Sequence, residues 1–174
     1  MNAAGVVPAA PQDPVDAGVF RRAMGRFATG VTVVTTAHRG FDHAMTANAF
    51  TSVSLDPLLV LVCVEQEARF HEAIEATGLW SVSVLDDSAR GAADWLATRG
   101  RPLHGQLDRV PHHRGLRTGI ALLDQSLATL ECRTTALHPG GDHTIVVGEV
   151  IGVHLIESDA AALVYYRGGY GRLP

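Results

Sequence analysis

Residues 127–156 read L-A-T-L-E-C-R-T-T-A-L-H-P-G-G-D-H-T-I-V-V-G-E-V-I-G-V-H-L-I, and this stretch decides the fold. Its two halves, 127–137 and 144–156, are rich in apolar and β-branched residues, and His138–Gly141 between them is a turn signal. The pattern predicts two long strands joined by a turn. A further strand at 161–166 follows a Ser-Asp turn signal, so the last third of the chain is predicted to be sheet.

The same strand pattern continues toward the N-terminus. Val31–Ala37 is β-branched, and the turn at His38–Asp42 predicts a hairpin that returns antiparallel through Met45–Ser54. Leu58–Val64 is a continuous apolar run, typical of a central strand buried on both faces. Leu79–Leu85 alternates apolar and polar residues, as a half-buried strand does. Six or seven strands are therefore expected in all.

Helical patterns separate these strands. Residues 14–27 place Asp16 as a helix N-cap before a periodic apolar face, and 68–77 and 86–98 predict two further short helices. The segment 100–119 is rich in Arg, His, Pro and Gly and is interpreted as a long surface excursion. The predicted fold class is mainly β with short helices (α+β), a closed antiparallel barrel with helical excursions rather than a doubly wound sheet.

Length and composition bound the domain organisation. At 174 residues and 47% apolar, the chain is long enough to bury a sizeable core without disulfide or metal staples. We expect a single domain at 16–174 after a flexible arm at 1–15. That arm lacks the basic start and apolar core of a signal peptide, and no run approaches the ~20 apolar residues of a membrane helix. A soluble, cytoplasmic protein that does not contact membranes is expected.

Charge and cysteine content exclude several function classes. The net charge is −4, and all 14 basic residues are Arg, so no basic cluster favours nucleic acid and no Lys is present for Schiff-base chemistry. Cys63 and Cys132 are too few for a disulfide framework and are expected to be reduced. Cys63 lies in an apolar run, where a thiol packs as a small hydrophobic group.

Motif searches are mostly negative. The chain has no G-x-G-x-x-G, no G-x-x-x-x-G-K and no G-x-S-x-G, so a Rossmann site, a phosphate loop and a nucleophile elbow are unsupported. His71–Glu75 begins like a zincin helix but lacks the second His. The remaining histidines of the excursion, His104, His112 and His113, are interpreted as solvated, and no metal site is expected.

Three stretches could carry chemistry. Met45–Ser54 combines small and hydroxylated residues, so a planar ligand with polar edges could lie against its backbone, although an ordinary strand with a solvated face fits too. Gly140–Thr144 could hold His143 at a strand mouth, with Asp142 accepting from its imidazole, or could be a plain turn. Tyr165–Tyr170 could be a packed strand end or an aromatic and guanidinium clamp for a nucleotide.

The order and spacing of these motifs resemble a known family, the short-chain flavin reductases. These are the reductase components of two-component flavin-dependent monooxygenases, such as the phenol and 4-hydroxyphenylacetate hydroxylase systems. The resemblance covers roughly Phe20 to Tyr170, nearly the whole chain. The motifs that carry it are F-R-R-A-M-G-R-F-A-T-G-V-T-V-V-T-T (20–36), M-T-A-N-A-F-T-S-V-S-L-D-P (45–57), G-G-D-H-T (140–144), V-G-E-V (147–150) and Y-Y-R-G-G-Y (165–170).

The resemblance implies a flavin reductase-like split β-barrel that forms a homodimer, with the flavin near the subunit interface. It implies an NAD(P)H-dependent flavin reductase, which reduces FAD (or FMN) by hydride transfer from NADH or NADPH and supplies a separate monooxygenase. Positions that match the family's flavin contacts are Thr46, Ala47, Asn48, Ala49, Thr51, Ser52, Val53, Cys63, Val64, Ala68, Arg69 and Phe70. Arg69 stands where relatives offer Ser and Thr for an FMN phosphate, which favours FAD.

On the other side of the flavin, the resemblance makes His143 the candidate catalytic residue, acting by positioning the nicotinamide. Hydride transfer needs stacked rings and no protein nucleophile or base. The other positions that match the nicotinamide site are Tyr166, Arg167, Gly168, Gly169 and Tyr170. Two alternatives stay open: a non-catalytic flavin-binding split barrel, which would need neither His143 nor the tail motif, and a relative of pyridoxamine-phosphate oxidase.

Overall fold

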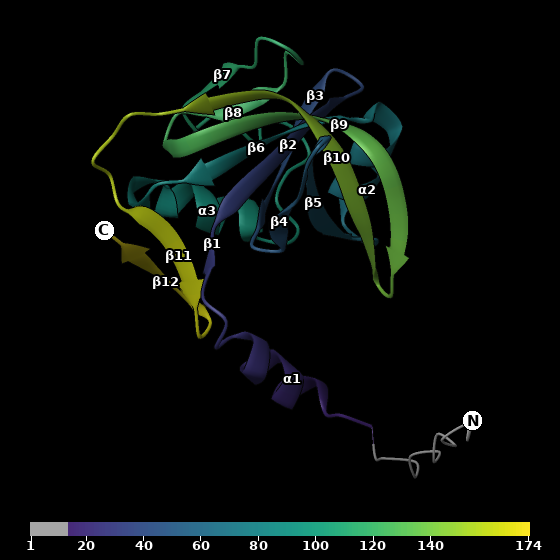
Figure 1. The fold of residues 1–174 in the computed structure, drawn as a ribbon, viewed down its shortest axis with the longest axis vertical. Coiled ribbons are helices and arrows are strands. Elements are labelled where there is room, and N and C mark those ends of the chain that lie inside the picture. Colours follow the sequence, from purple (N-terminus) through teal and green to yellow (C-terminus); the bar gives the residue numbers. More distant parts are fainter. Residues whose placement is uncertain (1–13) are drawn as a thin grey trace, which may run out of the picture.

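The computed structural model describes residues 14–174, and its centre is an antiparallel sheet of seven strands in the order β3-β2-β6-β9-β10-β5-β4 (Figure 1). The predicted mainly β, antiparallel class is confirmed. The expected arm at 1–15 lies outside the described residues except for its last two positions. The sheet strands are β2 (Thr32–His38), β3 (Phe41–Ala47), β4 (Phe50–Leu55), β5 (Leu58–Glu65), β6 (Leu79–Leu85), β9 (Ser126–Gly140) and β10 (His143–Leu155).

The β9–β10 hairpin is the longest feature of the sheet, as the sequence predicts (Figure 1). Its turn is tighter than expected: His143 pairs directly with Gly140, so only Gly141 and Asp142 remain in the turn. Gly141 has φ +73°, a left-handed conformation that glycine adopts without strain. His143 is therefore the first residue of a regular strand.

Met45–Ser54 is two strands rather than the single strand expected. Ala47 at the end of β3 pairs with Thr32, whereas Phe50 at the start of β4 pairs with Val62. The chain thus leaves one edge of the sheet and joins the other within two residues. Because β3 and β4 belong to opposite edges and diverge from this corner, the hydrogen-bonded ladder does not close between them, and the predicted closed barrel is corrected to an open, split one.

Three short helices accompany the sheet: α1 (Ala17–Met24), α2 (Arg69–Thr77) and α3 (Arg90–Ala97). The Asp16 carboxylate caps α1 by accepting from Val19 N at 2.9 Å, as predicted. Gly78 ends α2 in the left-handed conformation, with φ +63°. The third predicted helix is divided, because a 3₁₀ turn, η1 (Asp87–Ala89), precedes α3.

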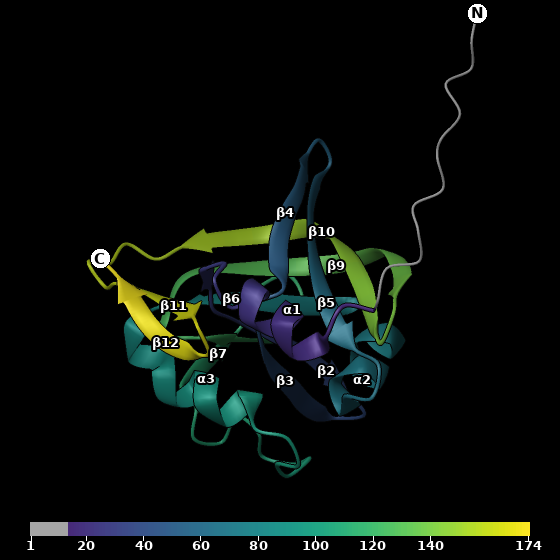
Figure 2. The same cartoon turned by 90° about the horizontal axis from the view of Figure 1, so that it is seen from below.

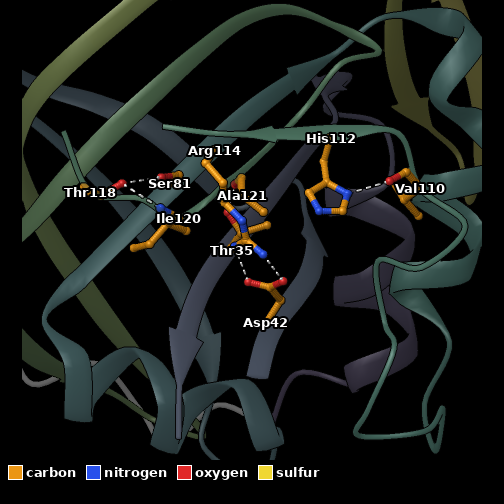
Figure 3. A network of polar contacts seen from close by, with 9 residues as sticks. All are labelled: Thr35, Asp42, Ser81, Val110, His112, Arg114, Thr118, Ile120 and Ala121. Atoms are coloured by element: carbon orange, nitrogen blue, oxygen red, sulfur yellow. Dashed lines mark hydrogen bonds and ion pairs between the residues drawn. The ribbon is translucent and has the colours of Figure 1, made fainter. Parts of the chain in front are cut away.

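The segment 100–119 is more than a surface excursion. Leu107 and Val110 are buried, and the segment continues into the small β7–β8 sheet (His112–Arg114 and Ala121–Leu123). Figure 3 shows how polar contacts fasten this sheet to the barrel: Arg114 forms a bidentate ion pair with Asp42 on β3, and Thr35 Oγ1 donates to the Ala121 carbonyl. The few apolar residues of 100–119 do not recur with the period of a strand or a helix, so the sequence pattern did not predict their burial.

A second, three-stranded sheet lies beside the main one, in the order β1 (Thr29–Gly30), β11 (Ala162–Tyr166) and β12 (Gly169–Leu173) (Figure 1). The predicted strand at 161–166 is confirmed, but the tail motif that follows is a hairpin turn leading into an unpredicted strand. Two apolar clusters fill the molecule, one around Trp80 on β6 and one in which Leu96 of α3 and Leu85 at the end of β6 take part.

Helix α1 is different, since none of its residues is buried. It stands apart from the main sheet and is tied to the C-terminal hairpin, where Arg167 N donates to the Gly25 carbonyl at 2.7 Å (Figure 1). Figure 2 also shows the β4–β5 hairpin projecting from the body. Both features carry large apolar side chains that residues 14–174 leave about half exposed or more.

Candidate functional site

A cavity of about 490 Å³ opens where the corner between β3 and β4 faces the start of α2 and the loop after α3. The structure brings half of the 18 predicted site residues to its wall. Nine of them line it: Thr46, Ala47, Asn48, Ala49, Cys63, Ala68, Arg69, Phe70 and His143. Their convergence from four separate elements comes from the tertiary fold, so it could not be read from spacing alone.

The corner at residues 46–49 forms a section of the cavity wall that has mostly short side chains. Ala47 and Ala49 have no side chain beyond Cβ, and Thr46 Oγ1 donates to the Ala93 carbonyl of α3 at 2.8 Å. The Thr46 hydroxyl hydrogen is therefore used to hold β3 against α3. What the corner presents to the cavity is mainly peptide backbone, as expected from its small residues.

Four predicted flavin contacts lie elsewhere. Thr51, Ser52 and Val53 are exposed on β4 and do not line the cavity. Val64 is fully buried in the Trp80 cluster, because side chains alternate along β5 and its neighbour Cys63 takes the cavity side. Within one chain, the cavity therefore ends at the corner rather than following β4.

The C-terminal hairpin is also outside the cavity. Of the predicted nicotinamide-binding residues, Tyr166, Arg167, Gly168, Gly169 and Tyr170 do not line it. The Tyr170 ring instead packs edge-on against Tyr165 with centroids 5.5 Å apart, and burial raises the pKa of the Tyr170 hydroxyl. The Arg167 guanidinium lies 5.1 Å from the centre of the Tyr166 ring. Both contacts are within the hairpin.

Helix α2 directs its N-terminus at the cavity. Its N-cap residue, Ala68, provides no side-chain acceptor, so the first-turn amides lack side-chain capping. Amides in this position, with the helix dipole behind them, favour a negatively charged group. Arg69, the first helical residue, adds a guanidinium at the same place, and one of its amino groups donates to the Arg101 carbonyl.

Sequence reasoning missed the opposite wall, residues 96–101 with Gln106. Arg99 forms a bidentate ion pair with Glu65 at 2.7 and 2.9 Å, linking the loop after α3 to the end of β5. Arg101 reaches inward to the Ala44 carbonyl of β3. The only available signal was the Arg-Gly-Arg triplet at 99–101, which lay at the start of the segment interpreted as a solvated excursion.

Two histidines meet the cavity in different ways. His43 is buried, and this burial lowers the pKa of its imidazole, so it lines the wall as a neutral group. His143 stands half-exposed at the rim, with its Nδ1 2.7 Å from Oδ1 of Asp142. This hydrogen bond lowers the pKa of the Asp142 carboxyl. Asp142 thus contacts the imidazole, one of the arrangements that the sequence left open.

The described residues contain no group of three or more His, Cys, Asp and Glu side chains placed to hold a metal ion. Within residues 14–174, the helices are also too short to cross a membrane.

Comparison with known proteins decides the family. Residues 24–174 match the sequence profile of the family described as flavin reductase like domain. The chain belongs to this family. The flavin reductase-like domain is 45% identical over 145 residues to an NADH-dependent FAD reductase of Streptomyces globisporus, with 83% of this chain and 79% of the relative covered. It is 40% identical over 154 residues to the reductase component of 4-hydroxyphenylacetate 3-monooxygenase of Thermus thermophilus, covering 88% and 95%.

Among solved structures, the flavin reductase-like domain is similar to BorF, the flavin reductase component of a bacterial two-component tryptophan halogenase. The TM-score is 0.86 at 43% identity, with 91% of this chain and 99% of BorF covered. The family predicted from the sequence motifs is thereby confirmed. The relatives' names also agree with the predicted enzyme class, cofactors and two-component setting.

Proposed function

We propose that this protein is an NAD(P)H:flavin oxidoreductase whose cavity binds FAD or FMN. The observation that carries the proposal is the pairing of two unlike walls in one cavity, a peptide wall at 46–49 and a basic wall at Arg69 and the N-terminus of α2. A flavin has the same two parts, a planar ring with polar edges and a phosphate. The relatives' activities support the same reaction.

The residues present fit a flavin. Ala47 and Ala49 leave room for a flat ring to approach the backbone, and the Asn48 amide adds a donor and an acceptor. At the other end, Arg69 and the first-turn amides of α2 suit a phosphate. We assign Thr51, Ser52 and Val53 an indirect role, since they continue the corner strand without lining the cavity.

The reaction requires little covalent chemistry from the protein's own side chains. When bound, a flavin accepts hydride from nicotinamide C4 at N5 and a proton from solvent, giving reduced flavin and NAD(P)⁺. Asp142 holds the His143 imidazole by Nδ1, which leaves Nε2 to meet the nicotinamide at the cavity rim. His143 thus positions the donor ring rather than moving a proton.

We propose that flavin enters and leaves as a substrate and that reduced flavin passes to a separate monooxygenase. Asn48, Ala49 and Arg69 are exposed, so the cavity is open to solvent on the flavin side. This suits exchange better than permanent retention. The two-component systems named for the relatives support the delivery step.

A homodimer is proposed on the apolar surface that one chain leaves uncovered. On α1 and just after it, Val19, Phe20, Met24 and Phe27 are 50%, 59%, 51% and 69% exposed, and the tip of the β4–β5 hairpin exposes Leu55 to 86%. Exposed large apolar side chains in this number are typical of an interface with another chain. A second chain would also be the source of the nicotinamide-facing tail, 166–170. Sedimentation velocity should give twice the chain mass.

The proposal is tested by the loss of NADH absorbance when free FAD or FMN is added to the protein, with NADPH and riboflavin run alongside. Turnover of many flavins per chain is expected. Flavin binding without turnover with either nicotinamide would favour the alternative, a non-catalytic flavin-binding split barrel. Oxidation of pyridoxamine phosphate without NADH would instead favour the pyridoxamine-phosphate oxidase reading.

A further inference from the structure

Arg101 carries a charge into the cavity wall from a loop with no regular structure. Its Nη1 donates to the Thr98 carbonyl at 2.9 Å, and its Nη2 donates to the Ala44 carbonyl and, at 3.4 Å, to Gln106 Oε1. All three acceptors are neutral. The Nε hydrogen is buried and has no acceptor among the described residues. Arg101 is therefore fixed in place but incompletely satisfied.

The charges around Arg101 do not compensate it. In the part of the chain that the structure describes, the ion pairs leave out both Arg69 and Arg101. The cavity's third guanidinium, on Arg99, is neutralised by Glu65. Burial, and then repulsion from Arg69, lowers the pKa of Arg101, which indicates a positive charge held at a cost.

An uncompensated guanidinium beside a second one is stabilised by an anion. The Arg69 amino group already donates to the Arg101 backbone carbonyl, so the two residues share one section of the wall. The amides at the start of α2 lie in that section as well. The cavity therefore concentrates donors for oxyanions at one end, while its corner 46–49 offers neutral backbone.

We propose that Arg101, together with Arg69, forms a phosphate-recognition pair that selects phosphorylated flavins, FAD and FMN, over riboflavin. This inference rests on the proposed function and assigns Arg101 as its specificity-determining residue. If Arg101 served only to hold its loop in place, its Nη contacts to Ala44, Thr98 and Gln106 would be enough. The uncompensated charge on Arg101 and Arg69 is what a phosphate group would satisfy.

Equilibrium binding of three flavins tests the proposal, measured as quenching of flavin fluorescence without nicotinamide. In Arg101→Gln, the Kd for FAD and for FMN should rise about 10- to 100-fold, as expected for loss of a charge-assisted hydrogen bond to phosphate. The Kd for riboflavin should change less than about 2-fold. Arg101→Lys keeps the positive charge but loses the planar guanidinium that can bind phosphate bidentately, so it should recover part of the affinity.

The matched control is Arg39→Gln, which removes an equal charge from an exposed turn where Arg39 pairs with Glu72 outside the cavity. It should leave all three dissociation constants unchanged. Urea unfolding midpoints of each variant separate loss of binding from loss of fold.

Two results would overturn the proposal. An equal rise in the Kd for riboflavin, FMN and FAD in Arg101→Gln would show that Arg101 only holds the loop in place. An unchanged Kd for all three flavins would show that Arg101 takes no part in flavin recognition. Either result leaves the proposed reductase standing, provided that the wild-type protein binds flavin and oxidises NADH with it. Failure of the wild-type protein to bind any flavin would instead remove the proposed function itself.

Discussion

Gly148 lies on β10 directly against the ring of Trp80, and a methyl group there should be costly. A Cβ at position 148 would stand 2.5 Å from Cζ2 of Trp80 and 3.0 Å from Cε2, well inside the ~3.5–4.0 Å of normal carbon contact. Trp80 has no exposed surface and donates from Nε1 to Thr134 Oγ1 at 3.2 Å. The indole therefore has no direction in which to retreat without losing that bond or displacing the core.

Overpacking of this kind typically costs about 1–3 kcal/mol. We expect the upper end of that range for Gly148→Ala, because the overlap is with a rigid, fully buried ring. For a chain of this length, 1 kcal/mol lowers Tm by about 2–4 °C, so about 3 kcal/mol predicts a loss of about 6–12 °C. Flavin affinity should change little, since Gly148 does not line the cavity.

Flavin-free thermal unfolding, followed by far-ultraviolet circular dichroism, measures the change in Tm, and urea unfolding of the same variants measures the change in free energy. The control is Gly91→Ala on the exposed side of α3, where an added Cβ meets nothing within 4 Å. That change should stabilise the protein by about 0.5–1 kcal/mol, as helix propensity predicts. Similar midpoints for the two variants would refute the packing argument at Trp80.

Three further predictions concern single side chains. His143→Ala should raise the KM for NADH and slow turnover while flavin Kd stays within about 2-fold, and an equal loss of flavin binding would show that its role is misassigned. Arg69→Ala should raise the flavin Kd by about 10- to 100-fold in a fluorescence titration, and an unchanged Kd would remove Arg69 from the site. Burial raises the pKa of Cys132 from 9.0 to about 12, so the unfolded chain releases this proton first as pH rises. The stabilisation by the buried, protonated Cys132 thiol should be complete below pH 9.0 and should fall by about 1.4 kcal/mol per pH unit toward pH 12. Urea midpoints of Cys132→Ala that fall with rising pH as steeply as those of the wild type would contradict this.

Local patterns determined most of the fold. The β-branched and apolar runs located the main strands, and Asp16 and Gly78 marked helix ends by capping chemistry that acts over a few residues. The break at Asn48–Ala49 had no such signal. Small polar residues tolerate both a strand and a corner, and only the pairing of β3 and β4 with opposite edges of the sheet decides between them.

The candidate site was predictable where resemblance to the family supplied the positions, as at 46–49, Arg69 and His143. It was not predictable where long-range contacts create the wall. Arg99 and Arg101 enter the cavity through partners far away in sequence, Glu65 and the Ala44 carbonyl. An Arg-rich loop has the same composition whether it is solvated or folded inward, so its role required the structure.

The central claim is that this cavity binds a flavin which the protein reduces and releases. Anaerobic mixing of the protein with excess FAD and larger excess NADH tests it most directly, with bleaching of the flavin absorbance as the signal. We predict that many equivalents of flavin per chain are reduced. Both variants should slow the bleaching, because Arg69→Ala raises the Kd for flavin and His143→Ala raises the KM for NADH. Bleaching that stops at one equivalent per chain would contradict release, and no bleaching with either FAD or FMN would contradict the reductase itself.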